Sequence, residues 1–461
     1  MVMESPRATT IDISESLSDQ LHTALTSQDA DLARSLAWLL DDDQADQLFE
    51  ALEPLEIHAL LELIGDERFA DLIVRLEDQQ AADVLEQLSV DRAASILAEI
   101  EPDDAADIFV EFEQDIGDSI LVAMEPDEAE EIRELLAYPA DTAGGIMTPA
   151  FVSIAPTLRA DQAVIALRKV AEEAETVNYV YVTDAADHLL GVLSLHKLVL
   201  TKPETPVSEL MYATPVTITA DADQEFAAKT LIDNDLLAIP VIDANNRLLG
   251  IITVDDVAEV LEREATEDIE RLGGSAPLSE PYLLASPLHL FQKRVGWLFV
   301  LFLAQFVTVS IISRYDNLLT QATVLSFFIP ILIGTGGNIG SQTVSTLIRA
   351  IGVGEVGPRH AVLVFWKEFR TGVALGAVMA ILMFGRALIT GGGTTEVAIS
   401  VGLAVFAIGA WAASVGSILP LLLTRLKVDP AVVSAPLISS LVDATGLIIY
   451  FSIANAILDI A

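Results

Sequence analysis

The chain has 461 residues, a formal net charge of −43 and no cysteine. It therefore cannot form disulfides or thiolate metal sites, and its negative field repels nucleic acid. The charge is uneven: residues 1–285 hold 61 of the 68 acidic and 15 of the 25 basic residues, a net charge of −46, and the remainder carries +3. The pattern predicts an acidic soluble part that attracts cations, followed by an apolar part. Salt adaptation is an alternative explanation for some of this acidity.

Residues 1–40 are expected to form an N-terminal segment, and their polar start lacks the apolar run of a secretory signal. From Asp41 to Leu136 the chain repeats every twelve residues, as in EPDDAADIFVEF and EPDEAEEIRELL. Each unit opens with an acid, Pro, Ser or Gly and continues with apolar residues at helical spacing. The pattern predicts short stacked helices that form an all-α superhelical domain over residues 41–138.

Two similar segments follow, over residues 139–201 and 202–262. Each predicts a short strand, a helix, a strand–turn–strand unit and a closing helix, with the polar turns DAADHLLG and DANNRLLG. This α/β duplication resembles a tandem cystathionine-β-synthase (CBS) pair, which is a regulatory module.

The second CBS-like copy ends in GIITVDD, and there Thr253 and Asp256 match the CBS positions that contact a nucleotide ribose. The first copy keeps Ser194 but has Lys197 in place of the acid. ATP binding at Thr253 and Asp256 is therefore one expectation, and a CBS pair without a nucleotide is the alternative.

A strongly acidic helix is expected next, in DDVAEVLEREATEDIERLGG, with residues 263–290 as a linking segment. Clustered acids destabilise a helix unless cations or basic partners neutralise them. A solvated acidic face is the alternative, but the position between regulatory and membrane parts favours a cation-responsive linker.

Residues 291–461 are expected to form a transmembrane domain of five helices. Basic residues cluster before the first span and in the connections after the second and the fourth. The positive-inside rule therefore places residues 1–294 in the cytosol, on the inner side of the cytoplasmic membrane. The five apolar runs cover about 295–312, 322–347, 371–389, 397–424 and 431–458.

Polar and helix-weakening residues interrupt the second of these runs. Its candidate pore-lining residues are Pro330, Gly336, Asn338 and Gln342. Glycine and proline predict irregular backbone, which at membrane depth survives only against protein or a watery cavity. Close packing of helices through small residues is the alternative explanation.

Asp443 is the only charged residue between Ala431 and Leu458. A carboxylate in such a segment is costly unless it faces protein or a watery pathway, so it indicates an ion path. Ala435, Ser439 and Asp443 are four residues apart and share one helix face.

The acidic helical repeat, the CBS pair, the helix EATEDIERLGG and the motifs GTGGNIGSQ and DPAVVSAPLISSLVDATG together resemble the MgtE family of magnesium transporters and channels. The resemblance implies a homodimer in the membrane lipid with one Mg²⁺ pore between its subunits, and no enzymatic activity. Asp443 matches the pore aspartate, with Ser439 and Ala435 on the next turns. Relatives often carry asparagine where this chain has Ala435.

The resemblance also implies regulatory Mg²⁺ between the helical domain, the CBS pair and the linking, or plug, helix. Bound Mg²⁺ would draw these parts together and close the pore. The matching acidic residues are Asp71, Asp103, Asp107, Asp223, Glu225, Asp235, Asp256, Glu259, Glu264, Glu267 and Asp268.

Other functions stay open or are disfavoured on the residues alone. The six histidines never form an H-E-x-x-H motif, and neither a P-loop nor a nucleophile elbow occurs, which argues against an enzyme or an ATP-driven pump. A nonconducting cation sensor would leave Asp443 unexplained. Transport of Co²⁺, Mn²⁺ or Ca²⁺ is a further alternative, although the predicted spans contain no histidine or cysteine.

Overall fold

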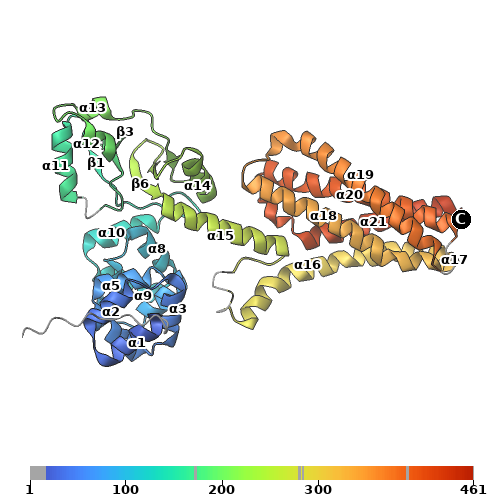
Figure 1. Ribbon diagram of the computed structural model, residues 1–461, viewed down its shortest axis with the longest axis horizontal. Coiled ribbons are helices and arrows are strands. Elements are labelled where there is room, and N and C mark those ends of the chain that lie inside the picture. The colour runs from blue at the N-terminus through green and yellow to red at the C-terminus, as the bar shows by residue number, and fades with distance from the viewer. Residues whose placement is uncertain (1–16, 171–173, 279–281, 283–284, 391–393, 460–461) are drawn as a thin grey trace, which may run out of the picture. The chain divides into compact units, whose positions relative to one another are not determined.

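The computed structural model describes residues 17–170, 174–278, 282, 285–390 and 394–459. The chain divides into two compact units, Met1–Glu262 and Arg263–Ala461. The first combines a helical domain with two small α/β domains, and the second is a bundle of long helices (Figure 1). The predicted multidomain fold class is confirmed.

In the part of the N-terminal domain that the structure describes, ten short helices surround one apolar core (Figure 1). Prolines occupy the first turn of α4, α8 and α10, where a missing N–H costs little. Two helices precede the twelve-residue repeat, and Leu21 and Leu36 from them are fully buried in the shared core. The helices are α1 Leu17–Ser27, α2 Ala30–Ala37, α3 Asp42–Ala51, α4 Pro54–Ile64, α5 Asp66–Ile73, α6 Asp78–Leu85, α7 Val90–Leu97, α8 Pro102–Glu111, α9 Gln114–Ala123 and α10 Pro126–Leu135.

Two three-stranded sheets with the same topology follow, as the duplicated sequence predicts. In each sheet the middle strand pairs parallel with the first strand and antiparallel with the third. The first copy consists of β1 Ser153–Ile154, α11 Ala160–Val170, β2 Tyr179–Thr183, β3 Leu189–Ser194 and α12 Leu195–Leu200. The second consists of α13 Val207–Leu210, β4 Ile218–Thr219, α14 Gln224–Asp233, β5 Ala238–Ile242, β6 Leu248–Thr253 and the start of α15 Val254–Gly273.

The acidic helix α15 is continuous across 20 residues. It ends at Gly273, and Gly274 follows with φ of +79°, a left-handed conformation that glycine adopts without strain. The next helix begins only at Pro287. Among the described residues of 263–290, the expected linking helix therefore covers only the part up to Gly273.

Among the described residues of the second unit, five helices are long and apolar enough to cross a membrane, judged by length and composition. They extend beyond the predicted spans because their ends include polar and charged residues that hydropathy alone omits. The second unit contains α16 Pro287–Arg314, α17 Asp316–Gln321, the 3₁₀ turn η1 Thr323–Phe328, α18 Ile329–Gly352, η2 Pro358–His360, α19 Ala361–Leu388, α20 Thr395–Arg425, η3 Pro430–Val432 and α21 Ala435–Leu458.

The expectation of irregular backbone in the second span holds only at its start, where the 3₁₀ turn η1 precedes Pro330. It is wrong for the glycines, because α18 is a continuous helix. Pro330 lies in its first turn, where no intrahelical N–H is needed. A Cβ on Gly336 would lie 2.7 Å from Ile408 Cγ2, and one on Gly340 would lie 2.7 Å from Ile438 Cγ2. These glycines therefore allow α18 to pack closely against α20 and α21, as the small-residue alternative proposed.

Candidate cation sites

Asp443 lies midway along α21, half-buried in an apolar helix. Its Oδ1 atom is buried and has no hydrogen-bond partner among the residues that the structure describes. Because an unpartnered buried carboxylate oxygen is costly, the site favours a cation, water or a second chain beside it. Toward the start of α21, Ser341 of α18 donates to the Ala435 carbonyl at 3.2 Å and lies 3.3 Å from Ser439 Oγ.

A polar stripe runs along one face of α18. Gly334, Asn338 and Gln342 are four residues apart and all exposed in the single chain. Amide side chains facing lipid would lose their hydrogen bonds, so this face fits protein or water better than hydrocarbon. The exposed Pro330 lies at the start of the helix, whereas Gly336 is buried in helix packing.

A second group of carboxylates lies in the first unit. Glu101, beside the first turn of α8, and Asp103 lie close to Glu175, which precedes β2, with ligand atoms within 4.8 Å of one another. Glu175 also lies within 4.8 Å of Asp255 and Asp256, at the start of α15. We call these five residues the cytosolic acidic cluster, after the side of the membrane that the sequence predicts for them. It joins the helical domain to both CBS-like copies within one compact unit.

The cytosolic acidic cluster includes buried carboxylate oxygens without a partner among the described residues. Asp103 is 7% exposed, and one oxygen each of Asp103 and Glu175 is buried without a partner among the described residues. Burial, followed by repulsion from Asp256, raises the pKa of Asp103 to about 7. Burial, followed by repulsion from Asp103, raises the pKa of Glu175 to about 8. Carboxylates held this close are suited to a hard divalent cation.

The pKa values of Asp104, beside the cluster, and of Asp256, within it, are also raised. Burial, followed by the charge of Asp103, raises the pKa of Asp104 to about 8. Burial also raises the pKa of Asp256, although hydrogen bonds from Thr253 oppose this shift. The Thr253 hydroxyl donates to Asp256 at 2.8 Å and also contacts Asp255. The two residues expected to meet a ribose are thus part of an acid-rich corner.

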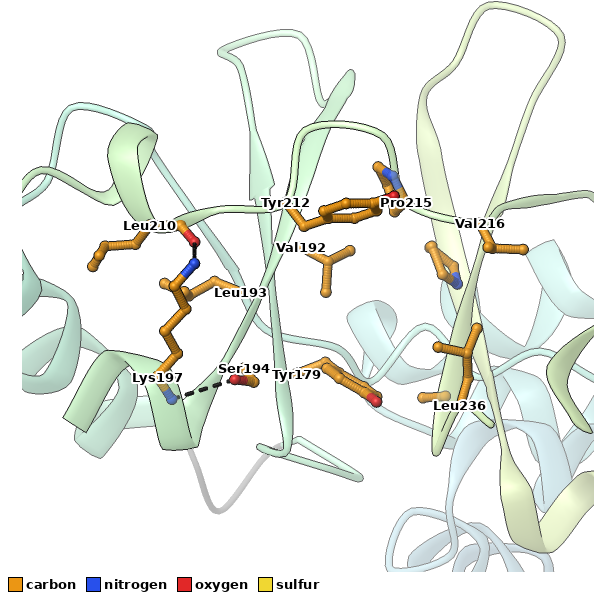
Figure 2. A pocket seen from close by; sticks show the side chains of 12 residues that line it. Tyr179, Val192, Leu193, Ser194, Lys197, Leu210, Tyr212, Pro215, Val216 and Leu236 are labelled. Carbon is orange, nitrogen blue, oxygen red and sulfur yellow. Dashed lines mark hydrogen bonds between the residues drawn. The ribbon is translucent and has the colours of Figure 1, made fainter. Parts of the chain in front are cut away.

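A separate pocket of about 260 Å³ lies beside the first CBS-like sheet (Figure 2). Tyr179 and Tyr212 line it, together with Ser194 and Lys197. Thr253 and Asp256 are not among its lining residues. The Lys197 ammonium donates to the Leu210 carbonyl at 2.6 Å, so the one cation of this pocket already has a protein partner.

Several predicted regulatory acids have local partners outside the cluster. Asp71 pairs with Arg68 at 2.7 Å, and Glu225 pairs with Lys229 at 2.7 Å. Asp223 is the N-cap of α14 and accepts from the Phe226 N–H at 3.0 Å. Glu267 pairs with Arg271. Asp235 is exposed, with a φ of +52°. The remaining ones lie on α8 (Asp107) and along α15 (Glu259, Glu264 and Asp268).

Of the predicted regulatory residues, Asp103 and Asp256 alone belong to the cytosolic acidic cluster as defined by its ligand atoms. Sequence reasoning missed Glu101, Glu175 and Asp255 as possible ligands. Glu101 and Asp255 directly neighbour predicted positions, so the local acid density could have indicated them. Glu175 does not belong to a helical or strand pattern in the sequence, so no such pattern could have indicated that it lies beside the other acids of the cluster.

Together, the five membrane-capable helices among the described residues, a carboxylate with one unpartnered oxygen in the last of them and an acidic soluble part with two CBS-like folds define a membrane protein that handles cations and carries a soluble N-terminal domain. Family models match residues 329–453 as MgtE, a divalent cation transporter, residues 40–141 as the MgtE intracellular N domain, and residues 207–263 as a CBS domain.

Two relatives cover most of the chain. The magnesium transporter MgtE of Thermus thermophilus is 41% identical over 329 residues, which are 71% of this chain and 73% of that protein. The magnesium transporter MgtE of Bacillus subtilis is 38% identical over 332 residues, 70% of this chain and 71% of that protein. The chain belongs to the MgtE family. Since this is a family of transporters, the expectation that the chain is not an enzyme agrees with it.

Solved structures resemble the first half of the chain. The crystal structure of the soluble part of a magnesium transporter is 33% identical, with a TM-score of 0.51, and the match covers 54% of this chain and 98% of that one. The cytosolic domain of the Mg²⁺ channel MgtE in complex with ATP is 31% identical, with a TM-score of 0.49, covering 53% and 99%.

Proposed function

We propose that the protein carries Mg²⁺ across the cytoplasmic membrane into the cell, through a pore that two copies of the chain form together. The observation that carries this proposal is the buried, unpartnered Oδ1 of Asp443 in a membrane-capable helix. Both relatives described above are magnesium transporters, which supports the choice of ion.

The pore carboxylate is suited to hydrated Mg²⁺. Mg²⁺ sheds water reluctantly and usually binds one or two carboxylates while keeping several waters. One Asp443 from each of two chains supplies two carboxylates, and Ser439 presents a hydroxyl one turn away on the same face. The exposed amides of Asn338 and Gln342 would line the same watery path and hydrogen-bond the waters that the ion retains.

Charge at the helix ends supports the proposed orientation. Lys293 and Arg294 lie near the start of α16, Arg425 is the last residue of α20, and Lys427 follows it. Basic residues near membrane ends favour the cytosolic side. The acidic first unit would then face the cytosol, where it could report the internal Mg²⁺ concentration.

We propose that Mg²⁺ bound to the cytosolic acidic cluster closes the pore. Without a cation, the carboxylates beside and on α8, of Glu175 and of α15 repel one another, and burial together with this repulsion raises the pKa values of Asp103 and Glu175. A divalent cation offsets this repulsion only when the three parts are close together. It therefore binds the compact arrangement more tightly and shifts the population toward it. Because α15 continues to Gly273, the shift would pass along this helix as the plug.

Adenine nucleotide is a second proposed ligand, and its place differs from the sequence expectation. The carboxylates around Thr253 and Asp256 would repel a triphosphate, whereas the pocket of Figure 2 offers two tyrosine rings for stacking. We expect Tyr179→Ala to weaken ATP binding in calorimetry and Thr253→Ala to leave it unchanged. Weaker ATP binding in Thr253→Ala, with unchanged binding in Tyr179→Ala, would instead place the nucleotide site at Thr253.

Growth of a strain deficient in Mg²⁺ uptake tests the proposed transport directly. The wild-type chain should restore growth at low external Mg²⁺, and Asp443→Ala should not restore it at equal membrane abundance. Parallel uptake measurements with Co²⁺, Mn²⁺ and Ca²⁺ separate Mg²⁺ transport from that of another divalent cation. A wild-type chain that binds Mg²⁺ but restores no growth would instead indicate a sensor.

A further inference from the structure

The residue after α15 lies close to both the start of α21 and Trp297 of α16. A Cβ on Gly274, the residue after α15, would lie 2.9 Å from Trp297 Cδ1 and 3.4 Å from Pro436 Cγ. The chain therefore passes directly against the indole ring and the first turn of α21 at this point. Only glycine combines this close approach with the observed φ of +79°.

The same indole is hydrogen-bonded to the N-cap of α21. Trp297 Nε1 donates to Ser434 Oγ at 2.9 Å. Ser434 is 1% exposed, and its Oγ accepts from the Leu437 N–H at 3.3 Å, which makes it the N-cap of α21. An N-cap residue fixes where a helix begins, so Trp297 contacts the residue that places the first turn of the helix carrying Asp443.

An ion pair links the end of α15 to η3, the turn that precedes α21. Arg271, in the last turn of α15, pairs with Asp429 at 2.8 Å, and Asp429 accepts from the Ala431 N–H at 2.7 Å as the cap of η3. The Arg271 and Asp429 side chains are 34% and 38% exposed. Because exposed ion pairs contribute little, the buried cap beside Trp297 is the stronger of the two links.

The segment after α15 is also attached to α16. The Ala276 N–H donates to the Lys293 carbonyl at 3.0 Å, and Lys293 Nζ donates to the Pro277 carbonyl at 2.6 Å. Lys293 lies one helical turn before Trp297. The residues that follow α15 therefore cannot move without acting on the turn of α16 that carries the indole.

We infer that Trp297 is a positioning residue that transmits the position of the end of α15 to the pore helix α21 through Ser434. This inference rests on the proposed transport and its closure by Mg²⁺. Displacement of Gly274 acts on the indole, and the indole N–H acts on the N-cap of α21. Removal of that N–H would weaken the coupling between α15 and α21 without changing Asp443.

Trp297→Phe tests this coupling with a matched control. Phenylalanine keeps a ring over Gly274 but lacks the N–H donor. Trp411 Nε1 of α20 donates to Thr445 Oγ1 at 2.8 Å, so Trp411→Phe also removes one indole–hydroxyl bond to α21. Trp411 is not among the atoms nearest to Gly274. Gly274→Ala, which displaces the indole instead of removing its donor, is a second variant of the same junction.

Full-length variants are compared in the strain deficient in Mg²⁺ uptake, at equal membrane abundance. Growth at low Mg²⁺ reports flux, and cellular Mg²⁺ content at high external Mg²⁺ reports closure. All variants should restore growth. In Trp297→Phe and Gly274→Ala, closure should require about fivefold more internal Mg²⁺, as expected for loss of one hydrogen bond, and Mg²⁺ should accumulate. Trp411→Phe should match the wild type.

The outcomes separate the two proposals. A wild-type chain that restores no growth refutes the proposed transport, whatever the variants do. If the wild type restores growth, normal closure in Trp297→Phe overturns the coupling. Equal loss of closure in Trp411→Phe overturns it as well, because any bond to α21 would then suffice. Lost growth in Trp297→Phe at normal abundance places the residue in the flux path and contradicts a role in closure alone.

Discussion

The two sites in this chain use carboxylates in opposite ways. Asp443 is the single acid of an apolar helix, and the chain supplies no second charge beside it on α21. The cytosolic acidic cluster gathers five acids from one chain, and burial, followed by their mutual repulsion, raises the pKa values of Asp103 and Glu175. A pore has to release its ion and needs few ligands, whereas a sensor has to hold an ion between moving parts. In the proposed function, the number of acids that each chain contributes therefore distinguishes the pore site from the sensing site.

Loss of Asp443, the proposed pore carboxylate, is expected to have the largest effect. Asp443→Ala should reduce Mg²⁺ uptake to background, because an apolar pore lacks a group that attracts a strongly hydrated cation. Asp443→Asn should do nearly the same, since it keeps the volume and removes the charge. Uptake into proteoliposomes, followed with an entrapped Mg²⁺ indicator, measures both.

Asp316→Asn is the control for this substitution, because Asp316 begins the short helix α17 and lies outside the column of α21. Uptake in Asp316→Asn should equal that of the wild type. Normal Mg²⁺ uptake by a folded Asp443→Ala chain would show that Asp443 is not needed in the ion path.

The sequence allowed prediction of the features that follow from periodicity and composition. The twelve-residue repeat, the duplicated α/β unit and the five apolar runs all correspond to elements of the structure. Asp443 was identifiable because its charge contrasts with its apolar neighbours. The continuity of α18 was not predictable, because the same glycines that weaken an isolated helix allow close packing between helices. Gly336 is a clear case, since its missing side chain leaves room for Ile408 and Val442.

The cytosolic cluster was predictable only in part. Asp103 and Asp256 were expected from the family resemblance, and their meeting point with Glu175 depends on how the helical domain packs against the CBS pair. Such tertiary contacts leave no periodic signal in the sequence. Asp71 was expected from the same resemblance, and in the structure it has Arg68 as a local partner outside the cluster.

Substitution within the cluster should have the second-largest effect. Asp256→Asn should leave uptake at low Mg²⁺ intact and raise the internal Mg²⁺ needed for closure by about tenfold, as expected for a typical coupling energy between sites. Protection of the full-length chain from trypsin across a Mg²⁺ titration measures this shift. Asp71→Asn is the matched control and should titrate like the wild type, since Asp71 already pairs with Arg68. An equal shift in both variants would mean that acidity in general, and not this cluster, senses Mg²⁺.

The pH dependence of stability should show a smaller effect of the same cluster. The pKa values of Asp103 and Glu175 are raised to about 7 and about 8 in the folded chain, so the folded state holds protons that the unfolded state has released. Stability without Mg²⁺ should therefore fall as the pH rises from about 5 to about 8, and stay constant above that. Thermal unfolding of the first unit within the full-length chain measures the change.

Mg²⁺ should counteract this loss of stability, because it binds the ionised carboxylates. Its stabilising effect should be large near pH 8 and small near pH 5, where protons occupy the same oxygens. Asp103→Asn removes one of the titrating groups and should flatten the pH dependence without Mg²⁺. Stability that rises between pH 5 and pH 8 without Mg²⁺ would contradict the raised pKa values.

Addition of a polar ligand to the pore should have the smallest effect. Ala435 lies on the Asp443 face of α21, and its carbonyl is already fixed by Ser341, so asparagine can enter without moving the backbone bond. Ala435→Asn adds one neutral oxygen that can hydrogen-bond a water of the hydrated ion. Such a water-mediated bond is weak in net terms, so the external Mg²⁺ needed for half-maximal uptake should fall by only about two- to threefold. Ala444→Asn places the same amide off this face and should leave the concentration unchanged. Improvement in both variants would mean that the column from Ala435 to Asp443 has no special part in guiding the ion, and that Asp443 acts alone.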